Sequence, residues 1–212
     1  MQRLFIMIMI GACMLGSVSC KNKERQGEGE YTPLKDITSH NKYALQEETE
    51  QKILDSSVME GKKKELTVEE MLEYFYEHFY SELSQEEIEE RIWAGSTYYK
   101  ESGYYEEMTD YWENTREVRD IANKMEPLFF TDMKYYTEED FTNVPLVVIH
   151  LAKNEIYAKH GYIFVNEDLN NYFMGCAWYE PVCGKDQFND QVFNDYERKN
   201  LELLTKLEKE LK

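Results

Sequence analysis

The feature that most constrains this sequence is a helix-forming run from Pro145 to Gly161. Its first half, from Leu146 to Ala152, is apolar on nearly every face, which is typical of a buried helix. Glycine adopts the left-handed conformation that follows many helices without a steric cost. The run therefore predicts one buried central helix that ends at Gly161, with the rest of the fold organised around it.

Further helices are expected on both sides of this run. Thr67 with Glu70, and Ser84 with Glu87, have the spacing of capping boxes. Aromatic residues (17 Tyr, 10 Phe, 3 Trp) can supply a core, because each ring buries much apolar area. The fold class is predicted to be mainly α, a small helical domain preceded by an acidic, aromatic-rich helical region. The expected helices cover residues 67–79, 84–95, 106–125, 137–140, 166–175 and 193–211.

The first 19 residues have the pattern of an export signal. Arg3 is their only charged side chain, and an unbroken apolar run follows from Leu4 to Ile10. That run is too short for a membrane-spanning helix, which needs about 20 residues. Small residues stand at positions −1 and −3 before Cys20, as in the lipobox of bacterial lipoproteins, whose cysteine is lipidated and becomes the first residue of the mature protein.

The position of the lipidated cysteine has an alternative. The four residues that end at Cys13 match the usual lipobox more closely than those that end at Cys20. Cleavage before Cys13 would leave an apolar region of only about seven residues, and the polar stretch that begins at Lys21 suits cleavage before Cys20. Lipidation at Cys20 is therefore predicted, and an ordinary secretory signal without lipid is the other possibility.

This layout divides the chain into four parts. Residues 1–19 are the predicted lipoprotein signal peptide, and residues 20–64 are polar and are expected to form a flexible tether. Residues 65–127 form the helical region and residues 128–212 the second domain. The expected location is the extracytoplasmic face of the cell membrane, where the protein is held by its lipid anchor.

The net charge bears on the possible partners, and the cysteines bear on a possible disulfide. The net charge is −18, from 24 basic and 42 acidic residues, which argues against binding nucleic acid through a basic surface. An exported domain meets an oxidising compartment, so Cys176 and Cys183 are expected to form a disulfide around the loop that contains Trp178. The alternative is that both cysteines are buried free thiols.

A short motif at the end of the central helix carries a resemblance to a known family. The motif is Tyr157-Ala158-Lys159-His160-Gly161, preceded by Asn154; Tyr172-Phe173, Trp178-Tyr179-Pro181 and the segment 196–200 follow it. Over residues 130–212 the sequence resembles the bacterial YARHG domain. The resemblance implies a small extracellular domain of lipoproteins and other exported proteins, without a defined reaction. Lys159 stands where arginine is usual. Lysine lacks the planar guanidinium group, so the sequence does not favour a ligand that needs two parallel hydrogen bonds from this position.

Two function classes remain for this motif. His160 with Tyr157 and Asn154 has the groups for proton transfer, and an envelope hydrolase with His160 as general base is the alternative function. No nucleophile or carboxylate pair stands at a recognised spacing, so a structural motif is favoured, with His160 bonded to backbone carbonyls and Tyr157 buried. The favoured function is an extracellular interaction module for a cell-wall polymer or another exported protein.

Metal ions and cofactors are not expected. His150 and His160 are ten residues apart, and the spacing of Cys176 and Cys183 does not fit a zinc knuckle.

Overall fold

The computed structural model describes residues 65–118 and 122–211. The predicted signal peptide, the tether and both candidate lipidation sites, Cys13 and Cys20, lie outside the described residues. Within the described part the chain is helical, in agreement with the predicted fold class, and no described helix is both long and apolar enough to cross a membrane.

The first two helices begin where the capping boxes predict. Helix α2 (Val68–Tyr80) starts after Thr67, and α3 (Gln85–Glu101) starts after Ser84. In both boxes the N-cap hydroxyl accepts from the N3 amide, and the N3 glutamate accepts from the N-cap amide. Helix α3 continues past Gly95, so the predicted end at that glycine is wrong.

The predicted helix 106–125 is interrupted. Helix α4 (Tyr105–Asp110) runs into the π-helical turn η1 (Tyr111–Thr115). The backbone then leaves the helix, and Glu117 has a φ of 54°, a conformation that a helix interior does not contain. A short helix, α5 (Ala122–Met125), follows before Pro127.

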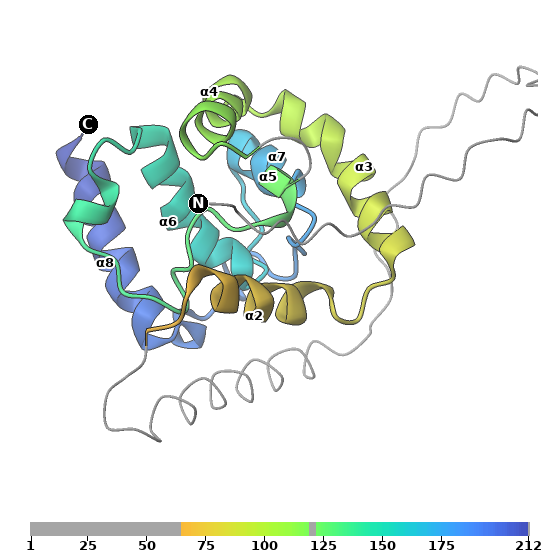
Figure 1. Cartoon of the computed structure of the whole chain (residues 1–212). Coiled ribbons are helices and arrows are strands. Elements are labelled where there is room, and N and C mark those ends of the chain that lie inside the picture. Colours follow the sequence, from red (N-terminus) through yellow and green to blue (C-terminus); the bar gives the residue numbers. More distant parts are fainter. Residues whose placement is uncertain (1–64, 119–121, 212) are drawn as a thin grey trace, which may run out of the picture. The chain divides into compact units, whose positions relative to one another are not determined.

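The second half of the chain is built around α6 (Leu146–Lys159), the predicted central helix. The 3₁₀ turn η2 (Glu138–Phe141) precedes it, and α7 (Glu167–Met174), the 3₁₀ turn η3 (Asp190–Val192) and α8 (Asp195–Glu210) follow it. Helix α6 packs against α8 and α7, and α7 packs against α3, as can be followed in Figure 1. Its buried side chains include Val148, Ile149, Leu151, Ala152 and Ile156.

The chain reverses after α6 through a turn and a single bridge. Gly161 has a φ of +72°, which confirms the predicted left-handed position. Its carbonyl accepts from the amides of Val182 (2.7 Å) and Cys183 (3.1 Å), and Tyr162 forms a parallel β-bridge with Cys183. The turn therefore fixes the loop that contains Trp178 against the end of α6.

The predicted disulfide is not present, since Cys176 and Cys183 are both free thiols. The Cys176 Sγ lies 3.6 Å from the carbonyl oxygen of Tyr172, and burial raises the pKa of this thiol. Cys183 is half-buried, and its backbone is held by the bridge to Tyr162. Each cysteine is thus positioned by its own local backbone contacts, which the spacing of the two residues does not reveal.

Candidate functional site

The motif residues lie at the C-terminal end of α6 and in the turn after it. The side chain of Asn154 donates to the carbonyl of His150 (2.8 Å), one helical turn earlier. Gly161 is enclosed as well as left-handed: a Cβ atom placed on it would lie 2.7 Å from Val182 Cγ2 and 2.9 Å from the Glu180 carbonyl oxygen. The glycine is thus required by both its conformation and its surroundings.

His160 bonds to a carboxylate and not to the backbone carbonyls that were expected. Its Nε2 lies 2.7 Å from Glu197 Oε1, and both side chains are only 1% exposed. The second oxygen of Glu197 accepts from the amide of Asn194 (2.9 Å) in the capping box that begins α8. One buried carboxylate therefore fastens the end of α6 to the start of α8, a contact across 37 residues of sequence.

Tyr157 is half-buried, so the prediction of a buried ring is wrong. The ring contacts those of Tyr162 and Phe188 and lies edge-on to Phe193, with centroids 5.1 Å apart. The His160 ring also contacts Phe193, at 5.3 Å. The two candidate catalytic residues thus both contact Phe193, but Tyr157 is half-buried whereas His160 is buried.

Lys159 is buried within an ion cluster. Its Nζ donates to Asp132 Oδ1 (2.6 Å) and to the carbonyl of Phe129 (3.1 Å), and lies 4.0 Å from Glu155 Oε1. Its side chain is 4% exposed. Burial alone would lower the pKa of Lys159, but Asp132 and Glu155 raise it above its usual value. Lysine, a compact charge with three donors, thus makes two hydrogen bonds and a further ion pair from one ammonium group.

Glu155 lies one turn before Lys159 and is 1% exposed. Its carboxylate accepts from the backbone amides of Leu128 (2.8 Å) and Phe129 (3.3 Å). Burial raises the pKa of Glu155 to about 7, against the opposing effect of Lys159 and of the two amides. Two carboxylates, Glu155 and Asp132, thus share one ammonium group in a largely buried site, and the pKa of Glu155 stays above its usual value despite these contacts.

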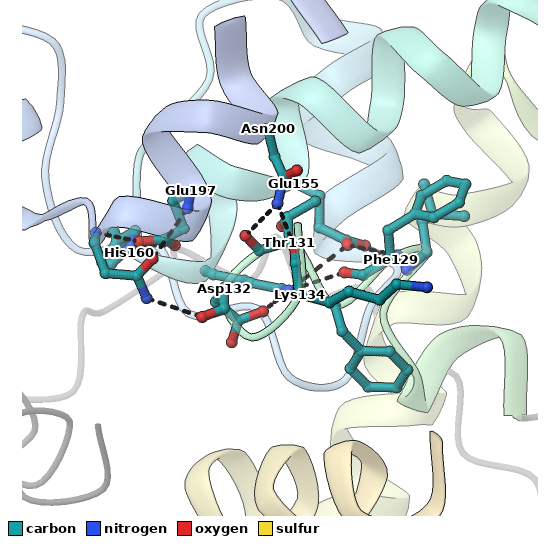
Figure 2. A network of polar contacts seen from close by, with 12 residues as sticks. Phe129, Thr131, Asp132, Lys134, Glu155, His160, Glu197 and Asn200 are labelled. Carbon is teal, nitrogen blue, oxygen red and sulfur yellow. Dashed lines mark hydrogen bonds and ion pairs between the residues drawn. The ribbon is translucent and has the colours of Figure 1, made fainter. Parts of the chain in front are cut away.

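Side chains at the start of α8 and within it also bond to the segment before α6 that contains Phe129 and Asp132. The side-chain amide of Asn200 accepts from the Tyr136 amide (3.0 Å) and donates to the carbonyls of Thr131 (2.8 Å) and Lys134 (2.7 Å). Asn194 donates to the carbonyl of Asp132 (2.9 Å). Figure 2 shows Asn200 and Glu155 beside Thr131 and its neighbours in residues 128–136, the segment that we call the clamped loop. Several backbone polar groups of the loop are therefore satisfied by side chains of α6, of α8 and of its N-cap residue.

Several members of this network were not identified from the sequence: Asp132, Glu155, Glu197 and Asn200. The sequence does contain a signal for Glu155. It stands four residues before Lys159 in a helix that is largely apolar, where charged side chains are expected to be paired. The partners in the clamped loop carry no such signal, since each contact joins residues that are far apart in sequence.

A second buried carboxylate links α6 to α8 further along both helices. Glu208 is 5% exposed and pairs with His150 (2.8 Å) and with the ammonium group of Lys153. His150 and His160 therefore face different carboxylates. Among the residues that the structure describes, no group of three or more His, Cys, Asp or Glu side chains is arranged to hold a metal ion.

Gly161→Ala should lower the free energy of unfolding by about 2 kcal/mol or more, because the new Cβ meets Val182 and the backbone conformation becomes strained. Gly184→Ala is the matched control, since a Cβ there has no atom within 4 Å. Urea denaturation measures both. Equal stabilities for the two variants would contradict the role assigned to Gly161.

Glu155→Gln should change how stability depends on pH. The pKa of Glu155 is raised in the folded state, so its protonation stabilises the fold fully below the usual value of 4.5, and this contribution is lost as the pH rises through about 7. Relative to the glutamine variant, the wild type should therefore lose up to about 3 kcal/mol between pH 4.5 and pH 8. Glu90→Gln, at an exposed position, controls for the change in net charge. A difference between wild type and Glu155→Gln that stays constant over this range would refute the assignment.

Comparison with known proteins identifies the domain that this network holds together. Residues 126–209 match the model of the YARHG domain family, and this range contains α6, α7, all but the last residue of α8 and almost all of the polar network described above. No curated protein matches the chain, and no solved structure does. The resemblance predicted from the motif is confirmed: residues 126–209 of this chain match the YARHG domain.

Proposed function

We propose that this protein is a bacterial lipoprotein, anchored through Cys20 to the extracytoplasmic face of the cell membrane, whose YARHG domain is an interaction module. The support for the anchor is the sequence before Cys20, with Arg3, an apolar run and small residues at positions −1 and −3. The strong excess of acidic residues argues against a nucleic-acid partner.

The observation that carries the choice of a binding role is the burial of His160. A general base must come within hydrogen-bond reach of the proton that it removes. His160 and Glu197 are each 1% exposed, and His160 is bonded to Glu197 beneath the start of α8. These groups fasten two helices together, which supports a structural role for the motif over the alternative of a small envelope hydrolase.

The proposed partner is a cell-wall polymer or another exported protein. Large apolar side chains are available for such a contact: Trp93 is 79% exposed, Tyr135 is 47% exposed and Val165 is 91% exposed. Aromatic side chains are enriched at binding surfaces, because one ring offers a large and rigid contact area. Tyr135 and Val165 belong to the YARHG domain, whereas Trp93 lies on α3 before it.

The anchor can be tested by feeding cells an alkyne-tagged fatty acid and detecting the label on the protein. Cys20→Ala should abolish labelling and leave the precursor uncleaved or the protein released from the membrane. Two acyl chains are needed for stable attachment, because a single chain binds only marginally. Cys13→Ala is the matched control and should be labelled normally. Labelling that survives in Cys20→Ala but is lost in Cys13→Ala would place the anchor at Cys13.

The choice between binding module and hydrolase can be tested with isolated cell-wall sacculi. The purified wild-type protein should release no soluble fragments from them, because His160 is closed to the substrate. His160→Gln should lower thermal stability through the loss of the Glu197 pair. Fragment release by the wild type that His160→Gln abolishes, with the melting temperature unchanged, would establish the hydrolase instead.

A further inference from the structure

One aromatic face of the YARHG domain is covered by helices that precede the domain in the chain. The face consists of Tyr172, Phe173 and Gly175 at the end of α7 and of Trp178 in the following loop, and we call it the Trp178 face. The helices that cover it lie in residues 65–118, outside the family match of 126–209. The family match therefore begins at residue 126, whereas the packed core extends into the helices before it.

Helix α2 contributes aromatic contacts to the Trp178 face. The Phe75 ring is edge-on to Trp178, with centroids 6.0 Å apart, and Phe79 lies 5.6 Å from the same ring. Phe75 is completely buried. The Lys159 ammonium group also lies 5.9 Å from the centre of the Phe75 ring, a distance typical of a cation–π contact. Phe75 thus joins the aromatic face to the ion cluster of α6.

Helix α3 crosses α7 at two glycines. A Cβ on Gly95 would lie 2.7 Å from the Met174 carbonyl oxygen and 3.1 Å from Gly175 Cα. Conversely, a Cβ on Gly175 would lie 2.6 Å from Tyr99 Cβ. The two segments approach so closely that neither position has room for a side chain, and this explains why a glycine stands within α3.

Hydrogen bonds surround this contact. The amide of Gly103 donates to Asp168 Oδ1 (2.8 Å), and the hydroxyl of Ser102 donates to the carbonyl of the same residue (3.2 Å). Farther along the chain, the Arg116 guanidinium donates to the carbonyl of Leu128 (2.9 Å), which belongs to the clamped loop. An apolar centre with a polar rim is the usual anatomy of a specific interface.

We propose that the Trp178 face is a docking surface for helices, and that residues 65–118 are its resident ligand, bound in cis. The face selects a helix with a glycine at the crossing point and a second helix that brings aromatic side chains to Trp178. The contact is specific enough to hold without the peptide link between the two parts. The cis contact itself does not depend on the proposed function.

The full chain can test this proposal once a protease recognition sequence is inserted after Arg119. The protein is folded first, then cut, and the pieces are analysed by size-exclusion chromatography in native buffer. The two pieces should elute together, and each should be recovered from the same peak. Elution of the pieces in separate peaks would overturn the proposal.

Two variants of the cut protein test which contacts hold the pieces together. Phe75→Ala should weaken their association at least about 100-fold, because truncating a buried aromatic ring removes its packing and leaves a cavity. Gly95→Ala should separate the pieces in the same assay, since it forces α3 away from α7. The matched controls are Trp93→Ala, at an exposed ring, and Gly184→Ala, at an open glycine.

Circular dichroism of the uncut variants separates loss of docking from loss of folding. Gly95→Ala should keep its helical signal before cutting and lose the association afterwards. A Gly95→Ala protein whose pieces stay together as tightly as those of the wild type would overturn the assigned crossing. Dissociation of the two control variants to the same extent would overturn the specificity of the face.

Discussion

The structure depends on one buried carboxylate. Glu155 accepts hydrogen bonds from the amides of Leu128 and Phe129 and lies beside the Lys159 ammonium group, in a place where both side chains are almost fully enclosed. A buried charge is costly unless it is paired and hydrogen-bonded. The clamped loop therefore supplies hydrogen bonds that the buried Glu155 requires, and it is fixed to α6, the helix that packs against both α7 and α8.

The residues of the family motif, 157–161, can be explained by the contacts that they make. Lys159 holds the clamped loop, His160 holds the start of α8, and Gly161 turns the chain so that Val182 and Cys183 can bond to it. Ala158 is 2% exposed, where a larger side chain would have to displace its neighbours. Lys159, His160 and Gly161 thus each secure a different segment at the end of one helix. That distribution of roles is expected of a structural centre and differs from a catalytic site, where side chains converge on one open position.

Much of the secondary structure could be predicted from the sequence because its signals are local. The capping boxes at Thr67 and Ser84 act over three residues, and the left-handed Gly161 follows from the end of a helical pattern. Gly95 was misread for the same reason. A glycine that ends a helix and a glycine that admits a second helix look alike until the neighbour, here Gly175, is known.

The site was harder to predict, because its contacts join distant residues. Glu197 as the partner of His160, and the clamped loop as the partner of Glu155, depend on how α6, α8 and the loop come together. The same holds for Cys176 and Cys183, for which the expected oxidising compartment suggested a disulfide although each is held by its own backbone contacts. Charged residues on a largely apolar helix were the one sequence signal that a buried polar network was present.

The central claim is that the Glu155 carboxylate fixes the clamped loop to the core, and native-state hydrogen exchange tests it most directly. The amides of Leu128 and Phe129 should exchange only through global unfolding, as slowly as the slowest amides of α6. The exposed Lys185 supplies the reference for a fast amide. If Leu128 and Phe129 exchanged as fast as Lys185, the clamped loop would open independently of the core, and this account of the domain would be contradicted.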